Sequence, residues 1–226
     1  GLLVSEYEDG PDGPFYSAHD KIYDRWFAGK PQEGEKIYEQ GTSAADAEDA
    51  NARIDTEVNA GGGILSFVGH GGYQSWGKSF SIFRTRAPSA TEPDDLEDIS
   101  QDVPLLFTVQ ANCITGNFSA TSSPESSSGI HYSFLEDWLT TERKGVAAGF
   151  APAHLTFENR IESILDPVYE EIFGREKERA VAVIDARLRQ KFDTLNDVVN
   201  VRSFMLHGDP AGRLSVAGGV ALNDAV

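Results

Sequence analysis

Short apolar runs alternate with longer segments in which apolar residues recur at helical spacing, and this alternation continues along most of the chain. The runs have the length of buried strands, and the periodic segments have the length of crossover helices. This order is typical of an α/β protein whose helices connect the strands of a mostly parallel sheet. Strands are expected at residues 1–5, 36–39, 64–68, 104–110, 145–150 and 213–216. Helices are expected at residues 18–27, 44–60, 93–99, 134–139, 161–173 and 179–192.

Length and composition favour one domain. The chain has 226 residues, of which 40% are hydrophobic, and this is enough to bury a sizeable core. Neither an internal repeat nor a convincing linker divides it. We therefore expect a single domain over residues 1–226, with 217–226 as a C-terminal tail. The chain opens on an apolar run without a start methionine, so we also expect it to be a fragment of a longer protein.

The charge of the chain narrows the range of partners. Its formal net charge of −17 repels phosphate backbones and argues against nucleic acid. No apolar run approaches the roughly 20 residues that a membrane-spanning helix needs, so no such segment is predicted. The pattern carries no information on the oligomeric state.

Cys113 is the only cysteine, so an internal disulfide is excluded. A lone cysteine is either a small buried hydrophobe or a nucleophile, and its neighbours have to decide. The histidines lack the close paired spacing of a zinc motif, and no metal site is predicted from them.

Two expected strands end in residues that carry chemistry. One runs into Gly69-His70-Gly71-Gly72, and the next long apolar strand runs into Asn112-Cys113. If the strands are parallel neighbours, His70 and Cys113 emerge at the same edge, where ligands collect in open α/β sheets. A nucleophilic thiol needs an imidazole to exchange its proton, and the glycines leave backbone N–H groups open to an oxyanion. On these grounds alone, an unrelated histidine and cysteine is an equally good interpretation.

Three motifs, in the same order as in a known family, indicate that His70 and Cys113 belong together. Residues 64–72, followed by Trp76-Gly77, resemble the histidine segment of the gingipain-family cysteine peptidases: an apolar strand, Gly-His-Gly, a short gap and Trp. Residues 109–118 resemble the nucleophile segment of that family, and residues 204–210 resemble its closing Gly-Asp-Pro. Three motifs in order, with strands between them, are a fairly specific signature.

The resemblance implies the caspase-like fold, an α/β three-layer sandwich with a mostly parallel central sheet flanked by helices. It implies a cysteine endopeptidase that works through a thioester acyl-enzyme. His70 and Cys113 carry over as the catalytic dyad, with the backbone amides of Gly71 and Cys113 as the oxyanion hole. In this superfamily the histidine protonates the leaving amine. An acidic residue after the first strand orients it. Glu8 lies at about that position, with Asp9 as a fallback, and a solvated loop acid is the alternative for Glu8.

The resemblance also suggests substrate-binding residues. Phe157 follows the strand at 145–150, where the family places an aromatic lid over the specificity pocket, and His154 either lines that pocket or lies on the surface. Trp76 is either a wall of the cleft or packing beneath the loop. Arg- or Lys-directed members need a carboxylate in that pocket, and its position in the family corresponds to about Tyr16 or Ser17 here, neither of which is acidic. The nearest carboxylates along the chain, Asp12 and Asp20, are several residues out of step, and Asp20 as the pocket acid is the alternative. We therefore expect a neutral or small substrate residue before the scissile bond, bound by Tyr16, His154 and Phe157.

Other roles are assigned more generally. A surface or capping role is expected for His19 and His131, and a structural one for His207. No cofactor is required by the implied chemistry. Structural calcium is compatible with the acidic runs 6–12 and 94–98, which equally fit a solvated face.

The expected partner is a protein or peptide substrate, and the family suggests a secreted or cell-surface protein. Two further functions stay open: a sortase-like transpeptidase on the same fold, and an inactive binding module. Retention of both His70 and Cys113 argues against the second.

Overall fold

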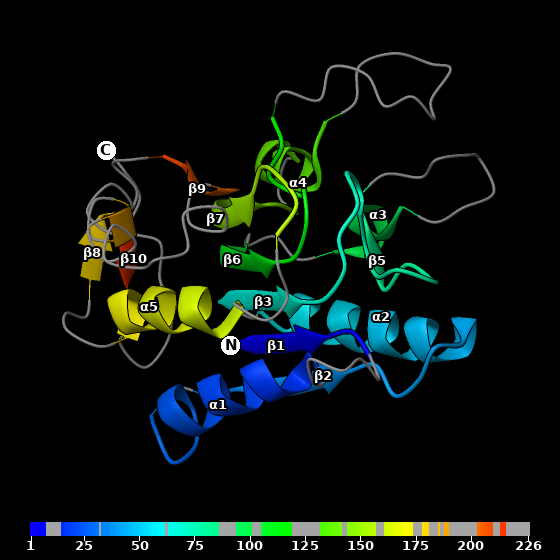
Figure 1. Ribbon diagram of the computed structural model, residues 1–226, viewed down its shortest axis with the longest axis horizontal. Helices are drawn as coiled ribbons and strands as arrows, with labels where there is room; N and C mark the ends of the chain where they lie inside the picture. Colours follow the sequence, from blue (N-terminus) through cyan, green and yellow to red (C-terminus); the bar gives the residue numbers. More distant parts are fainter. Residues whose placement is uncertain are drawn as a thin grey trace.

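A twisted, mostly parallel sheet forms the centre of the molecule (Figure 1). The computed structural model describes residues 1–7, 15–31, 33–61, 63–85, 94–100, 105–118, 132–141, 144–156, 161–173, 178–180, 185, 188–189, 203–209 and 213–215. Within these ranges, the sheet has six strands in the order β2-β1-β3-β6-β7-β9. Their bounds are Glu35–Tyr38 (β2), Leu2–Ser5 (β1), Ile64–Val68 (β3), Leu105–Ala111 (β6), Val146–Pro152 (β7) and Phe204–Gly208 (β9).

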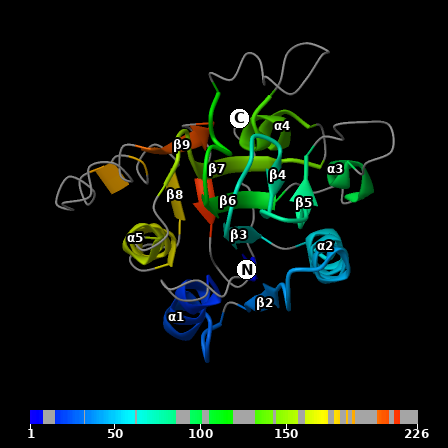
Figure 2. The ribbon, with the colours of Figure 1, turned by 45° about the vertical axis from the view of Figure 1, so that its right-hand side comes forward.

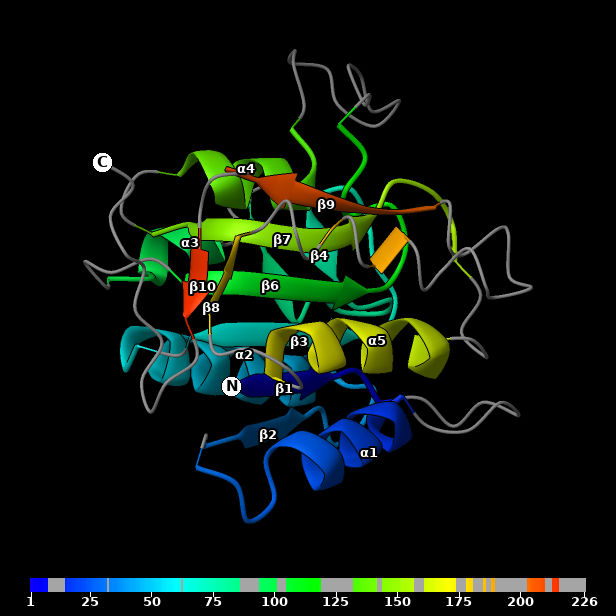
Figure 3. The ribbon, with the colours of Figure 1, turned by 90° about the vertical axis from the view of Figure 1, so that its left-hand side faces the viewer.

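All of these pairings are parallel except the last. Strand β9 lies antiparallel to β7 at one edge of the sheet, and Figure 3 shows it running opposite to β6. Two short antiparallel pairs lie outside the main sheet. They join β4 (Ser75–Trp76) to β5 (Phe83–Arg84), and β8 (Glu178–Ala180) to β10 (Arg213–Ser215).

Helices cover both faces of the sheet, as the alternation in the sequence predicts (Figure 2). Helices α1 (Tyr16–Trp26) and α5 (Ile161–Phe173) pack on one face. Helices α2 (Ala44–Asn59), α3 (Asp95–Asp98) and α4 (Phe134–Thr140) lie over the other. The caspase-like three-layer arrangement is therefore confirmed.

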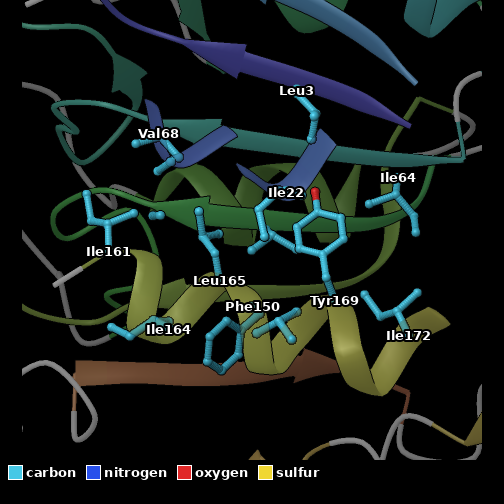
Figure 4. Packing of buried hydrophobic residues seen from close by; sticks show 14 of the residues in the cluster. Leu3, Ile22, Ile64, Val68, Phe150, Ile161, Ile164, Leu165, Tyr169 and Ile172 are labelled. Carbon is cyan, nitrogen blue, oxygen red and sulfur yellow. The ribbon is translucent and has the colours of Figure 1, made fainter. Parts of the chain in front are cut away.

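Strand β3 shows why the sequence reads as continuous apolar runs. All five of its residues are buried. Ile64 and Val68 pack towards α1 and α5, and Leu65 and Phe67 pack into the opposite core with α2 and α4. Figure 4 shows the first of these cores, where α5 places Ile161, Leu165 and Tyr169 beside the sheet. A strand covered on both faces has no polar side, so alternation disappears from its sequence.

Several expected boundaries are confirmed. The structure has a strand at Ile64–Val68 and a helix at Ile161–Phe173, as predicted. Helix α2 begins after Ser43, whose hydroxyl accepts a hydrogen bond from Asp46 N while the Asp46 carboxylate accepts one from Ser43 N. This capping box is worth about 1 kcal/mol to a helix.

One expected boundary is wrong. Residues 178–180 form β8, although the sequence predicts that a helix begins at residue 179. Their pairing with β10, more than thirty residues further along the chain, overrides local helical propensity.

His19 is placed differently from the expectation. It lies fully buried on α1, under the sheet, and not at the surface. Its Nδ1 is hydrogen-bonded to Ser5 Oγ at 2.8 Å, and its Nε2 to Ser66 Oγ at 2.9 Å. Burial lowers the pKa of His19 to about 3, so the ring is neutral in the folded protein. The neutral ring ties α1 to β1 and β3 together.

This buried histidine makes the stability depend on pH. In the unfolded chain His19 takes up a proton near its ordinary pKa of 6.5, whereas in the folded chain it does so only near 3. Because the unfolded state then binds more protons, its contribution to stability is complete above about pH 6.5 and is lost as the pH falls towards 3. The loss approaches about 1.4 kcal/mol for each pH unit.

We predict that His19→Gln, which keeps polar atoms but cannot be protonated, removes this slope. Denaturant unfolding from pH 8 to pH 4 should show the wild type losing stability relative to the variant below about pH 6.5. Asp55 and Asp95, whose pKa values burial raises to about 6, contribute the opposite slope, but they do so in both proteins and cancel in the difference. Parallel curves for the two proteins would contradict the prediction.

Candidate active site

The strand order reverses between β1 and β3, and this reversal creates the site. From β1 the chain passes to β2 on one side and then returns to β3 on the other. In doubly wound sheets the loops at such a point diverge and leave a crevice at the carboxyl ends of the strands. Glu6 follows β1, His70 follows β3, and Cys113 follows β6, the next strand along.

The pairing of β3 with β6 brings the histidine and cysteine loops together. Val68 is paired with Ala111 in the parallel ladder, and Gly69 N donates a hydrogen bond to Ala111 O at 3.4 Å. His70 and Cys113 therefore stand at equivalent positions, each two residues beyond a paired residue. Both residues lie where the parallel strands have their carboxyl ends, as the sequence predicts.

Glu6 holds the imidazole of His70. Its Oε2 lies 3.0 Å from His70 Nδ1 and accepts a hydrogen bond from His70 N, while its Oε1 accepts one from Lys78 N at 2.7 Å. The carboxylate is buried, whereas a quarter of the His70 side chain is exposed. A carboxylate on Nδ1 fixes the orientation of the imidazole ring.

Sequence reasoning missed Glu6. It pointed to Glu8, with Asp9 next to it, and both lie outside the described residues. A usable signal was present, because Glu6 follows an apolar strand directly, in the same strand-end setting that singled out His70 and Cys113.

Phe15 completes the surroundings of the histidine ring. It precedes α1, and its ring meets the His70 ring edge-on with centroids 5.3 Å apart. Phe15 is itself buried in the core beneath α1. Through Phe15, the core that packs under α1 therefore contacts the imidazole ring of His70.

The glycines after His70 shape a tight loop against β4. Gly77 N donates to His70 O at 3.0 Å, and Gly72 N donates to Ser75 O at 2.8 Å. Gly71 and Trp76 face each other between these two bonds, as a non-hydrogen-bonded pair. The N–H of Gly71 consequently points away from β4.

Trp76 anchors this loop from below. Its ring stacks on Phe67 and Phe134, with centroids 4.5 and 4.7 Å apart, and has no exposed surface. Of the two alternatives for Trp76, packing beneath the loop is the one observed, and a wall of the cleft is wrong. The physical reason is the aromatic core under α4, which encloses the indole.

Only glycine fits at position 71. A Cβ added there would lie 2.6 Å from Cys113 O and 2.7 Å from Asn112 Nδ2, closer than carbon approaches such atoms. The histidine loop and the cysteine loop are therefore in direct backbone contact.

The cysteine loop is held by the segment that follows β7. Cys113 is partly buried, and its Sγ lies 3.8 Å from Thr156 Oγ1. Thr156 Oγ1 donates in turn to Asn112 O at 2.7 Å, and Ile114 N donates to His154 O at 3.2 Å. Ile114 has a φ of +49°, which is an outlier for a β-branched residue and costs roughly 1–3 kcal/mol. Such strain persists only where neighbouring contacts impose it, as here.

The remaining predicted site residues are partly described. His154 is exposed and borders the cysteine loop through its backbone. Tyr16 is exposed at the start of α1, and its ring stacks on Tyr38 with centroids 5.7 Å apart. Phe157 lies outside the described residues. Asp20 is the described acidic residue that lies nearest to Tyr16 along the sequence. Its carboxylate accepts hydrogen bonds from Lys36 Nζ at 2.7 Å and Tyr38 Oη at 2.9 Å.

The acidic residues near α3 have structural partners. Asp94 Oδ1 accepts from Leu96 N, and Asp95 Oδ2 accepts from Arg84 N. Among the described residues, no group of three or more histidine, cysteine or acidic side chains is arranged to hold a metal ion. The described helices are also too short or too polar to cross a membrane.

Solved structures show where this fold occurs. A crystal structure of the Arg specific cysteine proteinase gingipain R superimposes with a TM-score of 0.64 and 17% identity, covering 93% of this chain and 46% of that one. A complex of Porphyromonas gingivalis RgpB pro- and mature domains gives a TM-score of 0.61 and 15% identity, covering 93% and 47%. The chain thus spans about half the length of the solved proteins that it matches. No curated protein matches its sequence.

The sequence itself identifies the family. The model of peptidase family C25 matches residues 4–215, which include the β1, β3 and β6 strand ends described above. By this match the chain belongs to peptidase family C25, the gingipain family.

Proposed function

We propose that the protein is a cysteine peptidase in which Cys113 is the nucleophile and His70 the general acid–base. The observation that carries the proposal is the placement of both residues at equivalent positions beyond neighbouring parallel strands, with a buried carboxylate on His70 Nδ1. Membership of family C25 supports the same chemistry.

The proposed reaction begins at Cys113 Sγ. As the Cys113 thiol passes its proton to His70 Nε2, the sulfur attacks the carbonyl carbon of the scissile peptide bond, and the electron pair of the C=O bond moves to oxygen. His70 Nε2–H protonates the leaving amine as the C–N bond breaks, which leaves a thioester on Cys113. His70 Nε2 then takes a proton from water as the water oxygen attacks the thioester carbon. The C–S bond breaks, the sulfur takes that proton back from His70, and the new carboxyl terminus is released.

The oxyanion is proposed to bind to the backbone N–H groups of Gly71 and Cys113. In support, Gly71 N–H is directed away from β4, and the Gly71 backbone approaches that of Cys113 closely. Preorganised donors of this kind stabilise the charge that develops on oxygen in the transition state. A side chain at residue 71 would force the two loops apart.

Replacement of either reacting residue tests the proposal. Cys113→Ala should abolish peptide hydrolysis, and His70→Ala should lower kcat by about 1,000-fold or more. Both should keep the wild-type circular dichroism spectrum, because each side chain lies in a partly exposed strand-end loop. Undiminished turnover in Cys113→Ala would refute the nucleophile assignment.

Glu6 is expected to act by orienting His70. Glu6→Gln keeps the size of the side chain but removes the charge that faces His70 Nδ1, and we predict a fall in kcat of about 100-fold with little change in KM. Glu39→Gln is the matched control. Glu39 is also a buried carboxylate directly after a strand, and it accepts a hydrogen bond from Tyr7 N instead of holding His70. An equal fall in kcat in both variants would show that any buried carboxylate at this edge affects activity to the same degree. It would contradict an orienting role that is specific to Glu6.

The substrate preference is proposed to be neutral or small at the residue before the scissile bond. Tyr16 carries no charge, and the Asp20 carboxylate already forms an ion pair with Lys36. A substrate cation buried against these two residues would then lack a partner, which is costly. His154, Tyr16 and Phe157 are the proposed lining of the pocket.

Peptide-library profiling checks this preference. We predict efficient cleavage after neutral residues, and no change in the profile for Asp20→Asn. Selective cleavage after Arg or Lys would contradict the prediction, and its loss in Asp20→Asn would identify Asp20 as the pocket acid.

A further inference from the structure

Asn112 occupies an unusual place, at the junction of three loops. It lies between the end of β6 and Cys113, and it is almost completely buried. By strand alternation its side chain lies on the same face of β6 as those of Thr108 and Gln110, the face covered by α4. A polar side chain in such a core requires an explanation from its contacts.

The contacts of Asn112 join the loops that follow β3, β6 and β7. Its Oδ1 accepts a hydrogen bond from Thr115 Oγ1 at 2.6 Å, within the cysteine loop. Its backbone oxygen accepts one from Thr156 Oγ1 at 2.7 Å, in the segment after β7. Its carboxamide also packs against Gly71, since a Cβ at Gly71 would lie 2.7 Å from Asn112 Nδ2 and 2.8 Å from its Cγ.

Gly71 is consequently held between two parts of the cysteine loop. The Asn112 carboxamide packs against its α-carbon, and the Cys113 carbonyl oxygen is equally close to the place that a Cβ would take. Asn112 Nδ2 is a buried donor with no hydrogen-bond partner among the described residues. Leaving such a donor unpaired costs about 1–3 kcal/mol, so stability alone does not favour asparagine here.

We propose that Asn112 is a positioning residue for the oxyanion hole, setting the spacing between the Gly71 and Cys113 amides. The inference rests on the proposed peptidase function. Asn112 does not touch the substrate, because its side-chain nitrogen is enclosed. It acts through Gly71: the carboxamide, fixed at its far end by Thr115, prevents the histidine loop from sinking towards β6. Two amides that share one oxygen have to stay within about 2.7–3.1 Å of it, so a small displacement weakens both bonds.

The test compares two chemistries of the same thiol. Peptide hydrolysis develops an oxyanion, whereas alkylation of Cys113 by iodoacetamide displaces iodide and develops none. For Asn112→Ala we expect kcat for peptide hydrolysis to fall about 10- to 100-fold, with KM within about 2-fold. We expect the rate of iodoacetamide alkylation at the same pH to stay within about 2-fold of the wild type.

Gln110→Ala is the matched control, because Gln110 is a fully buried amide two residues before Asn112, and its side chain, like Asn112 Nδ2, has no hydrogen-bond partner among the described residues. It should keep wild-type kcat at a temperature where it is folded. Thr115→Val, which is nearly isosteric and removes the hydrogen bond to Asn112 Oδ1, should lower kcat in the same direction by a smaller factor. This second variant carries the test if Asn112→Ala does not fold.

The outcomes separate the two proposals. An active wild type with equally active Asn112→Ala and Thr115→Val variants overturns the positioning role only. A parallel loss of alkylation and hydrolysis also overturns it, because Asn112 would then act on the thiol through Thr156. An equal loss in Gln110→Ala reduces the effect to general core packing and overturns it as well. A wild type that hydrolyses no peptide refutes the peptidase function itself, and this inference with it.

Discussion

The parallel register between β3 and β6 is the constraint on which the site depends. Because Val68 is paired with Ala111, strands β3 and β6 end at the same level of the sheet, and His70 and Cys113 follow them at equivalent positions. A register slip by one residue would turn one of these loops to the opposite face of the sheet. That register is secured by the apolar residues of both strands, which are buried in cores on both faces. The hydrophobic effect, and no contact within the site, thus sets the alignment of His70 with Cys113.

Around that alignment the loops are adjusted by a few contacts. Glu6, at the end of β1, fixes the imidazole, and Gly71 permits the backbone contact that brings the histidine loop against Cys113. Thr156 fixes the cysteine loop from the other side. The strained backbone of Ile114 shows that the turn after Cys113 is imposed by these neighbours rather than favoured by its own sequence. Each loop follows a different strand, so the site exists only when the sheet is complete.

Much of this arrangement was predictable from the sequence, for identifiable reasons. Strand β3 and helix α5 are strongly patterned, and their bounds agree with expectation. The strand-end positions of His70 and Cys113 singled these residues out, and the resemblance of their segments to the gingipain-family motifs indicated that they form a pair. The placement of other residues could not be predicted, because it depends on contacts between segments that are far apart in the sequence. Trp76 could not be assigned to core or cleft before Phe67 and Phe134 were seen to enclose it. His19 gave no sign that it would lie buried between two serines.

Covalent labelling tests the central claim most directly, that the β3–β6 register makes Cys113 a nucleophile served by His70. The measurement is the rate of labelling by a peptidyl acyloxymethyl ketone, with the modified residue mapped by mass spectrometry, in the wild type and in His70→Ala. The account predicts modification at Cys113 alone, with a large loss of rate in His70→Ala although the thiol remains. Labelling at another residue, or an equal rate in the two proteins, would contradict it.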